Sequence, residues 1–286
     1  EYKVDGETQV KDPQGMTGVR LEVETHLVTA SSIATKNIIK CISEVGASAQ
    51  SLVFSGLAAS FSVLTDTEKE LGVVLVDVGG GTTSIAVFVE GAITYSSVLP
   101  IGGKNITNDI AAGLRVSLES AEKIKIALGE EKEGADDELD LTTLGIVESE
   151  KTVSKKTLID GIIKPRLNEI FTMVGLELTN AEVAGKTPSG VVITGGSALC
   201  VGAVDSARRM LSLPVRLGRP AGVVGLIDEI ENPAFSVGVG LVLYGAKAAT
   251  SAPATWPGAG FLSRIEQIPV RGLLGRATDL IKNLLP

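Results

Sequence analysis

The sequence contains few aromatic residues, a single histidine and two cysteines. Aromatic side chains make up 3% of the 286 residues, so the core must be built from Val, Ile, Leu and Ala. His26 is the only candidate for a histidine base, and its alternating neighbours favour a strand position instead. Cys41 and Cys200 form no CxxC pair and no regular framework. This suits a reducing compartment with buried, inert thiols.

Long apolar runs and positive charge are also scarce. No run approaches the ~20 residues that span a bilayer, and no export signal is visible. The net charge of −8 argues against a broad nucleic-acid surface. The length of 286 residues suits about two domains, and the hydrophobic content of 44% is ample for a sizeable core. Because the first residue is Glu1 rather than Met, we expect a fragment or a processed chain.

The most informative stretch is a predicted β-meander with a glycine-rich first turn. Residues 73–78, 85–89 and 92–99 predict three strands, and DVGGGTT joins the first two. Such a turn can aim backbone N–H groups at an anion, its acid could hold Mg²⁺, and its hydroxyls could bond phosphate oxygens. A plain hairpin turn is the alternative. The candidate phosphate site comprises Asp77, Gly79, Gly80, Gly81, Thr82 and Thr83.

Two further places are weaker candidates for ligand contacts. Residues 190–194 predict a strand that ends at Gly195, Gly196 and Ser197, where backbone could approach a flat ligand or a phosphate. Glycine is also common there for turn reasons alone. Glu122 and Lys125 lie one turn apart on a helix predicted over residues 117–128, and such a pair usually marks a solvated helix face.

The rest of the chain gives a series of local expectations. Before the meander, the pattern predicts a strand at 19–28, a helix from Ser31 or Ser32 to 45, close packing of small residues at 51–64 and a charged connection at 65–70. After it, we expect a helix capped by Thr107 or Asn108, a mobile acidic loop at 130–140 and a helix over 154–174 that is split or kinked at Pro165. A helix at 201–211, a strand at 214–217 and a helix at 234–248 follow.

The C-terminal residues 268–286 predict an amphipathic basic helix behind a linker at 249–267. At ~100° per residue the apolar side chains fall on one arc roughly 140° wide, opposite most of the charges. Such a helix suits the face of an anionic membrane; docking on the body or on a partner is the alternative. The candidate membrane residues are Val270, Arg271, Leu273, Leu274, Arg276, Ala277, Leu280, Ile281, Lys282, Leu284 and Leu285.

Several blocks of sequence resemble the FtsA family of bacterial cell-division proteins, within the actin-like ATPase superfamily. They are GVRLEVETHLVT, LGVVLVDVGGGTTSIAVF, LPIGGKNITNDIAAGLR, VVITGGSA and NPAFSVGVGLVLYGAK, together with the terminal amphipathic helix. The match covers the chain from about residue 16 onward. It implies an α/β, actin-like (ribonuclease H-like) fold of two lobes with a C-terminal amphipathic helix.

The resemblance also implies a cofactor and its contacts. ATP would lie between the lobes, with Mg²⁺ positioned by Asp77 and the outer phosphates held by the loop from Gly79 to Thr83. Glu122 and Lys125 match a helix that contacts ribose and adenine, which reverses the preference for a solvated face. Gly195, Gly196 and Ser197 would lie against the adenosine. No strong hydrolytic base is visible, so at most slow ATPase activity is expected.

The function implied is that of a polymerising adaptor at the cytoplasmic face of the cell membrane. FtsA-like proteins form filaments, bind the C-terminal tail of the tubulin-like FtsZ, act beside other divisome proteins and attach peripherally to lipid. Alternatives on the same fold are a pilus-assembly adaptor and a small-metabolite kinase. The kinase would need an acid to deprotonate a substrate hydroxyl, and its chemistry gives no reason for the terminal helix.

The resemblance divides the chain and shows two departures. Implied segments are the end of an inserted subdomain at 1–26, first-lobe core at 27–69, second-lobe core at 70–112 and 187–232, an outer FtsZ-binding subdomain at 113–186, a connecting helix at 233–248, the linker at 249–267 and the membrane helix at 268–286. The family's first phosphate motif is absent. Ser84 stands where the family commonly has Asp, so one carboxylate near the phosphates is missing.

Overall fold

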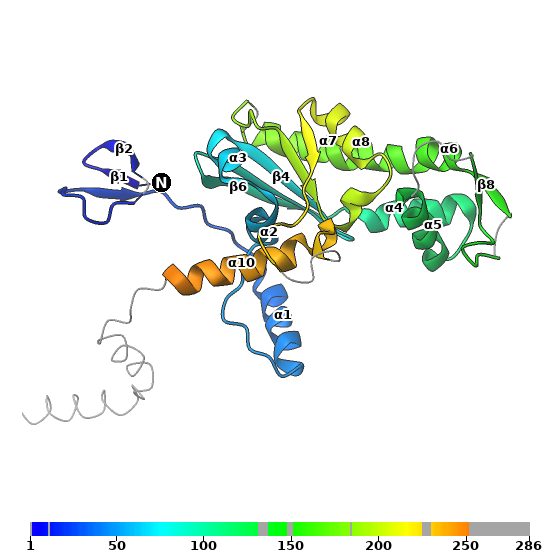
Figure 1. Ribbon diagram of the computed structural model, residues 1–286, viewed down its shortest axis with the longest axis horizontal. Coiled ribbons are helices and arrows are strands. Elements are labelled where there is room, and N and C mark those ends of the chain that lie inside the picture. Colours follow the sequence, from blue (N-terminus) through cyan, green and yellow to red (C-terminus); the bar gives the residue numbers. More distant parts are fainter. Residues whose placement is uncertain are drawn as a thin grey trace, which may run out of the picture. The chain divides into compact units, whose positions relative to one another are not determined.

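The computed structural model describes residues 2–10, 12–130, 137–147, 151–183, 185–224 and 230–251. The chain divides into two units, Glu1–Tyr244 and Gly245–Pro286. All the elements below belong to the first unit, except the end of the last helix (Figure 1). The predicted linker and membrane helix therefore lie almost wholly outside the described residues.

A five-stranded mixed sheet forms the centre of the first unit. Its order is β10-β9-β4-β5-β6, where β4 is Val73–Val78, β5 is Thr83–Val89, β6 is Ala92–Leu99, β9 is Val191–Thr194 and β10 is Val215–Leu217. The meander β4-β5-β6 pairs antiparallel, whereas β9 pairs parallel with both β4 and β10. The predicted meander is confirmed. The Val- and Ile-rich strands β4 and β5 are buried on both faces, whereas the edge strand β6 is mostly half-buried or exposed.

Alternate residues of the central strands enter two different cores. Val74, Val76 and Ile85 pack with the larger cluster, which also contains residues of α4 (Gly103–Leu114), α5 (Leu118–Glu130), α7 (Lys164–Asn180) and α8 (Ala203–Leu211). Val73 and Leu75 pack with the smaller cluster beneath α2 (Ser55–Val63). This is the two-residue period of a strand with helices on each side. Fully buried residues on both faces fix the register of the sheet.

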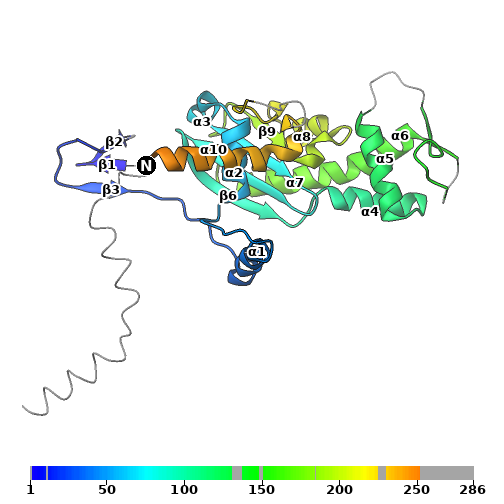
Figure 2. The same ribbon diagram turned by 60° about the horizontal axis from the view of Figure 1, so that its bottom comes forward.

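Two helices far apart in sequence cross at close range on the smaller cluster's side. α2 lies beside α10 (Ser236–Ser251), which follows the 3₁₀ turn η3 (Pro233–Phe235); both views show the pair (Figure 2). A Cβ on Gly240 would stand 1.9 Å from the backbone oxygen of Ala58. The Ser62 hydroxyl donates to the Ser236 carbonyl at 2.7 Å. The predicted close packing of the small-residue helix is thereby explained.

The helix predicted over residues 154–174 is interrupted before Pro165. Its parts are α6 (Lys155–Leu158), the π-helical turn η1 (Ile159–Ile163) and α7, with Pro165 in the first turn of α7. Proline lacks an N–H and its ring crowds the preceding turn, so the wider π-turn accommodates it. The predicted cap is also present, because the Ser154 hydroxyl accepts from the Thr157 N–H at 3.1 Å.

Three local expectations between residues 65 and 140 were wrong. Residues 65–70 are not a simple connection, because Asp66–Leu71 forms α3 behind a Thr65–Glu68 capping box. The helix predicted to start after Thr107 or Asn108 already begins at Gly103, since both residues lie inside α4. The acidic stretch is not all loop, because β7 (Glu138–Asp140) pairs with β8 (Thr152–Ser154).

The N-terminal residues form a small antiparallel sheet and a helix. The sheet has the order β2-β1-β3, where β1 is Tyr2–Val4, β2 is Glu7–Val10 and β3 is Leu21–Val23. The strand predicted over 19–28 is therefore much shorter. Among the described residues β3 pairs only with β1, and no strand pairs with the residues that follow it. The predicted first helix is confirmed as α1 (Ser32–Glu44). Among the described residues, no helix is long and apolar enough to cross a bilayer.

Candidate functional site

The glycine-rich turn between β4 and β5 is a tight, solvent-facing loop. The Gly79 N–H donates to the Thr82 carbonyl at 2.9 Å, which closes the turn. Gly80, Gly81 and Thr82 are exposed. No heavy atom would lie within 4 Å of a Cβ on Gly81, so the outer edge of the turn is open to a ligand. Thr83 is fully buried instead, and its hydroxyl donates to the Ile101 carbonyl at 2.8 Å.

Asp77, the last residue but one of β4, carries a carboxylate that has no protein partner in the described part of the chain. It is half-buried, and within the described ranges no hydrogen bond or ion pair reaches it. Burial raises the pKa of this carboxyl above its usual range, because the protein replaces water that would solvate the charge. A Cβ on Gly195 would stand 2.4 Å from the Asp77 Oδ1, so the loop after β9 closely approaches this carboxylate.

The start of α4 is hydrogen-bonded to the glycine-rich turn. The Gly103 N–H donates to the Gly79 carbonyl at 3.0 Å, and the Lys104 N–H donates to the Gly80 carbonyl at 2.7 Å. A Cβ on Gly102 would stand 2.6 Å from the Gly79 oxygen. Sequence reasoning assigned no site role to Gly102 and Gly103. The adjacent glycines themselves were the available signal, because such pairs permit close backbone contact.

The loop after β9 completes the same site from the other side. Gly195 has a φ of +89°, and Gly196–Leu199 forms the 3₁₀ turn η2. The Ser197 hydroxyl donates to the Gly79 carbonyl at 2.9 Å, so two turns that are 118 residues apart are in direct contact. A Cβ on Gly103 would stand 2.1 Å from the Ser197 Oγ, which leaves room for glycine alone.

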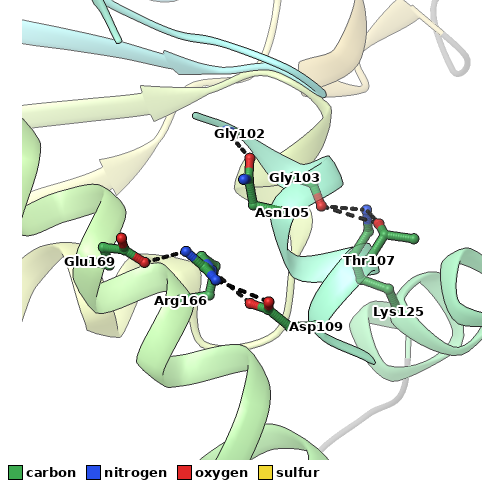
Figure 3. A network of polar contacts seen from close by, with 8 residues as sticks. All are labelled: Gly102, Gly103, Asn105, Thr107, Asp109, Lys125, Arg166 and Glu169. Atoms are coloured by element: carbon green, nitrogen blue, oxygen red, sulfur yellow. Dashed lines mark hydrogen bonds and ion pairs between the residues drawn. The ribbon is translucent and has the colours of Figure 1, made fainter. Parts of the chain in front are cut away.

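Glu122 and Lys125 belong to a polar network rather than to a solvated face. The Lys125 ammonium donates to the Thr107 hydroxyl at 2.9 Å and to the Gly103 carbonyl at 3.3 Å (Figure 3). It also donates to Glu122 at 2.6 Å. The Lys125 side chain is only 11% exposed. Burial raises the pKa of Glu122, but hydrogen bonds from Lys125 and Thr107 outweigh it and hold the pKa below its usual range. Thr107 is a network member that sequence reasoning assigned only to a cap.

Most of the predicted site residues thus meet at one edge of the sheet. The contacts join the turn after β4, the turn after β9, the start of α4 and the buried side of α5. The donor set fits a phosphate ligand with Mg²⁺, because an unpaired carboxylate lies beside an open turn of glycines. In the described part of the chain there is no group of three or more His, Cys, Asp or Glu side chains that could hold a metal ion by itself. An ion bound here would therefore need oxygens from the ligand and from water.

Comparison with known proteins gives a consistent set of relatives. The model of the family described as cell division protein FtsA matches residues 74–240, and that of the SHS2 domain inserted in FtsA matches residues 1–29. FtsA of Pseudomonas aeruginosa is 42% identical over 248 residues, covering 86% of this chain and 59% of that protein. FtsA of Escherichia coli K12 is 36% identical over 259 residues, and the match covers 87% of this chain and 61% of that protein. The chain thus spans about three-fifths of the length of these relatives.

Solved structures share the fold at low sequence identity. MreB5 of Spiroplasma citri bound to ADP has a TM-score of 0.60 at 18% identity and covers 78% of this chain and 68% of that one. The PilM–PilN type IV pilus biogenesis complex has a TM-score of 0.58 at 18% identity, and the match covers 74% of this chain and 57% of that one. The actin-like α/β fold is therefore confirmed. Because the first family model matches more than half of the 286 residues, the chain belongs to the FtsA family of cell-division proteins.

Proposed function

We propose that the site binds ATP with Mg²⁺. The observation that carries this is the 2.9 Å hydrogen bond from Ser197 to Gly79, because it joins the adenosine-type turn to the phosphate-type turn. MreB5 structures of the same fold are described as bound to ADP and to AMPPNP. In this proposal Gly79 to Thr82 hold the outer phosphates, and Gly195 and Gly196 lie beside the adenosine.

The remaining side chains of the site divide the other tasks. Asp77 orients Mg²⁺ through its carboxylate, which has no competing protein partner in the described ranges. Glu122 accepts a hydrogen bond from a ribose hydroxyl. Lys125 fixes the position of Glu122, which the 2.6 Å contact between these two side chains supports. Among the described side chains of the site, none is placed as a strong base toward an attacking water. In this proposal ATP acts mainly as a structural and polymerisation ligand, with slow hydrolysis at most.

We propose further that the chain acts as an adaptor in the divisome. Its family membership supports self-association into filaments and binding of the FtsZ C-terminal tail by the segment 113–186. The amphipathic pattern of 268–286 supports peripheral attachment to anionic lipid at the cytoplasmic face of the membrane. Those residues lie outside the described part of the chain, so this step rests on sequence alone.

Co-sedimentation with anionic liposomes tests the adaptor proposal. The intact chain should pellet with the vesicles and carry an FtsZ tail peptide with it, whereas the 268–286 deletion should leave both in the supernatant. Leu284→Glu should weaken lipid binding strongly because it places charge on the apolar arc. Asn283→Glu is the matched control, since it adds the same charge to the polar arc. An intact chain that stays in the supernatant at low salt would contradict membrane attachment.

A further inference from the structure

We propose that Lys104 is a phosphate-binding residue of this site, contacting the terminal phosphate of the nucleotide beyond the glycine-rich turn. The inference rests on the proposed ATP site and adds a cationic side chain that neither the motifs nor the turn geometry supplies. It comes from the position of the Lys104 side chain, from its charge and from the lack of an ion-pair partner for its ammonium among the described residues.

The side chain of Lys104 runs across Gly80. Its Cε and Cγ would stand 3.9 and 4.0 Å from a Cβ on Gly80, and no other heavy atom lies within 4 Å of that point. The backbone of Lys104 is fixed in the same place, because its N–H donates to the Gly80 carbonyl at 2.7 Å. The ammonium group is therefore carried on a stem that begins in the first turn of α4 and packs over Gly80 of the glycine-rich turn.

The charge of Lys104 is unfavourable for the helix in which it stands. It occupies the first turn of α4, where the helix dipole favours an anion and disfavours a cation. Lys104 is exposed, and among the described residues no carboxylate lies within the 4.0 Å of an ion pair. The other lysine of the site cannot take this role, because Lys125 is 11% exposed and bonded to Glu122. An anion at the turn would supply the missing counter-charge.

The end of α4 does not itself provide the contact. The N–H groups of Gly103 and Lys104 are already bonded to the carbonyls of Gly79 and Gly80. These two donors are thus committed to holding the helix on the turn, and the new contact falls to the lysine ammonium. Because the stem packs against Gly80, which belongs to the turn proposed to hold the outer phosphates, the contact assigned to the ammonium is the outermost phosphate rather than the adenosine.

Calorimetric titration of the intact chain with ATP, ADP and adenosine tests this placement. Lys104→Ala should weaken ATP binding about tenfold, the loss of one charge-assisted hydrogen bond, and should leave adenosine binding unchanged. Lys104→Arg should recover part of the loss. Lys36→Ala is the matched control, because it removes the same charge from an exposed position on α1 and should bind ATP like the parent chain.

The outcomes separate this inference from the proposed function. If the parent chain binds ATP and Lys104→Ala binds it equally tightly, the role of Lys104 is overturned while the ATP site stands. An equal loss for adenosine and ATP would also overturn it, because the lysine would then act on the fold of the turn. If the parent chain binds neither ATP nor adenosine, the ATP proposal fails and this inference fails with it.

Discussion

Ser84 lies directly opposite Asp77 across the β4–β5 pair, and its hydroxyl is 3.0 Å from that of Ser55 at the start of α2. Residues paired in this way point to the same face of a sheet. Ser84 is only 5% exposed. The position where a second carboxylate was expected is therefore occupied by a buried hydroxyl that links the strand to α2.

Replacing Ser84 by Asp should make stability depend on Mg²⁺. Without the ion, two carboxylates would share a partly buried site, and the free energy of unfolding should fall by about 1–3 kcal/mol. Added Mg²⁺ should restore part of that loss. Urea unfolding of Ser84→Asp and of the neutral, similarly sized Ser84→Asn would measure both effects. Equal Mg²⁺ responses in the two variants would contradict a second metal-facing carboxylate here.

The carboxylate of Asp77, for which the described residues offer no partner, should lower the stability of the ligand-free protein. Its pKa is raised in the folded state, so folding favours its protonated form. The penalty is absent well below the unfolded pKa and grows as pH rises through the folded pKa. Asp77→Asn should therefore unfold at an equal or higher urea concentration at pH 7, with the difference shrinking toward pH 4. Its stabilisation by Mg²⁺ and ATP should be lost.

Two glycines of α10 should respond in opposite directions to alanine. Gly240→Ala would drive its Cβ into the Ala58 carbonyl, only 1.9 Å away, and should cost about 1–3 kcal/mol of unfolding free energy. Gly238→Ala is the matched control, since nothing lies within 4 Å of a Cβ there and helix propensity should gain up to about 1 kcal/mol. Thermal unfolding of both variants would measure this. A neutral Gly240→Ala would contradict close helix contact.

The two cysteines should differ sharply in reactivity. Burial raises the pKa of the Cys200 thiol to about 11. Cys41 is exposed on α1, so the expectation of a buried thiol was wrong for this cysteine. Because thiolate is the reactive form, a thiol reagent at pH 8 should label Cys41 quickly and Cys200 only after unfolding. The protonated Cys200 thiol contributes fully to folding stability below its unfolded pKa near 9, and this contribution is lost as pH rises toward 11. Cys41→Ser should abolish the fast labelling phase.

The sequence alone determined the elements whose signal is local. Val- and Ile-rich runs separated by glycine specified β4, β5 and β6, and Pro165 specified the break between α6 and α7. The motif blocks specified the family, which the comparisons confirm. The capping box of Thr65 and Glu68 was equally local and was overlooked. The two errors of length, in 19–28 and at the start of α4, arose where a partner strand or a turn sets the boundary.

Only the tertiary structure decided which side chains of the site face one another. Glu122 and Lys125 have the spacing of a solvated pair, and their burial against Thr107 and Gly103 depends on how α5 packs on α4. The bond from Ser197 to Gly79 and the course of Lys104 over Gly80 arise because parallel pairing brings the ends of β4 and β9 to one edge. Contacts of this kind depend on the packing of residues that are far apart in the sequence, so no local sequence pattern predicts them.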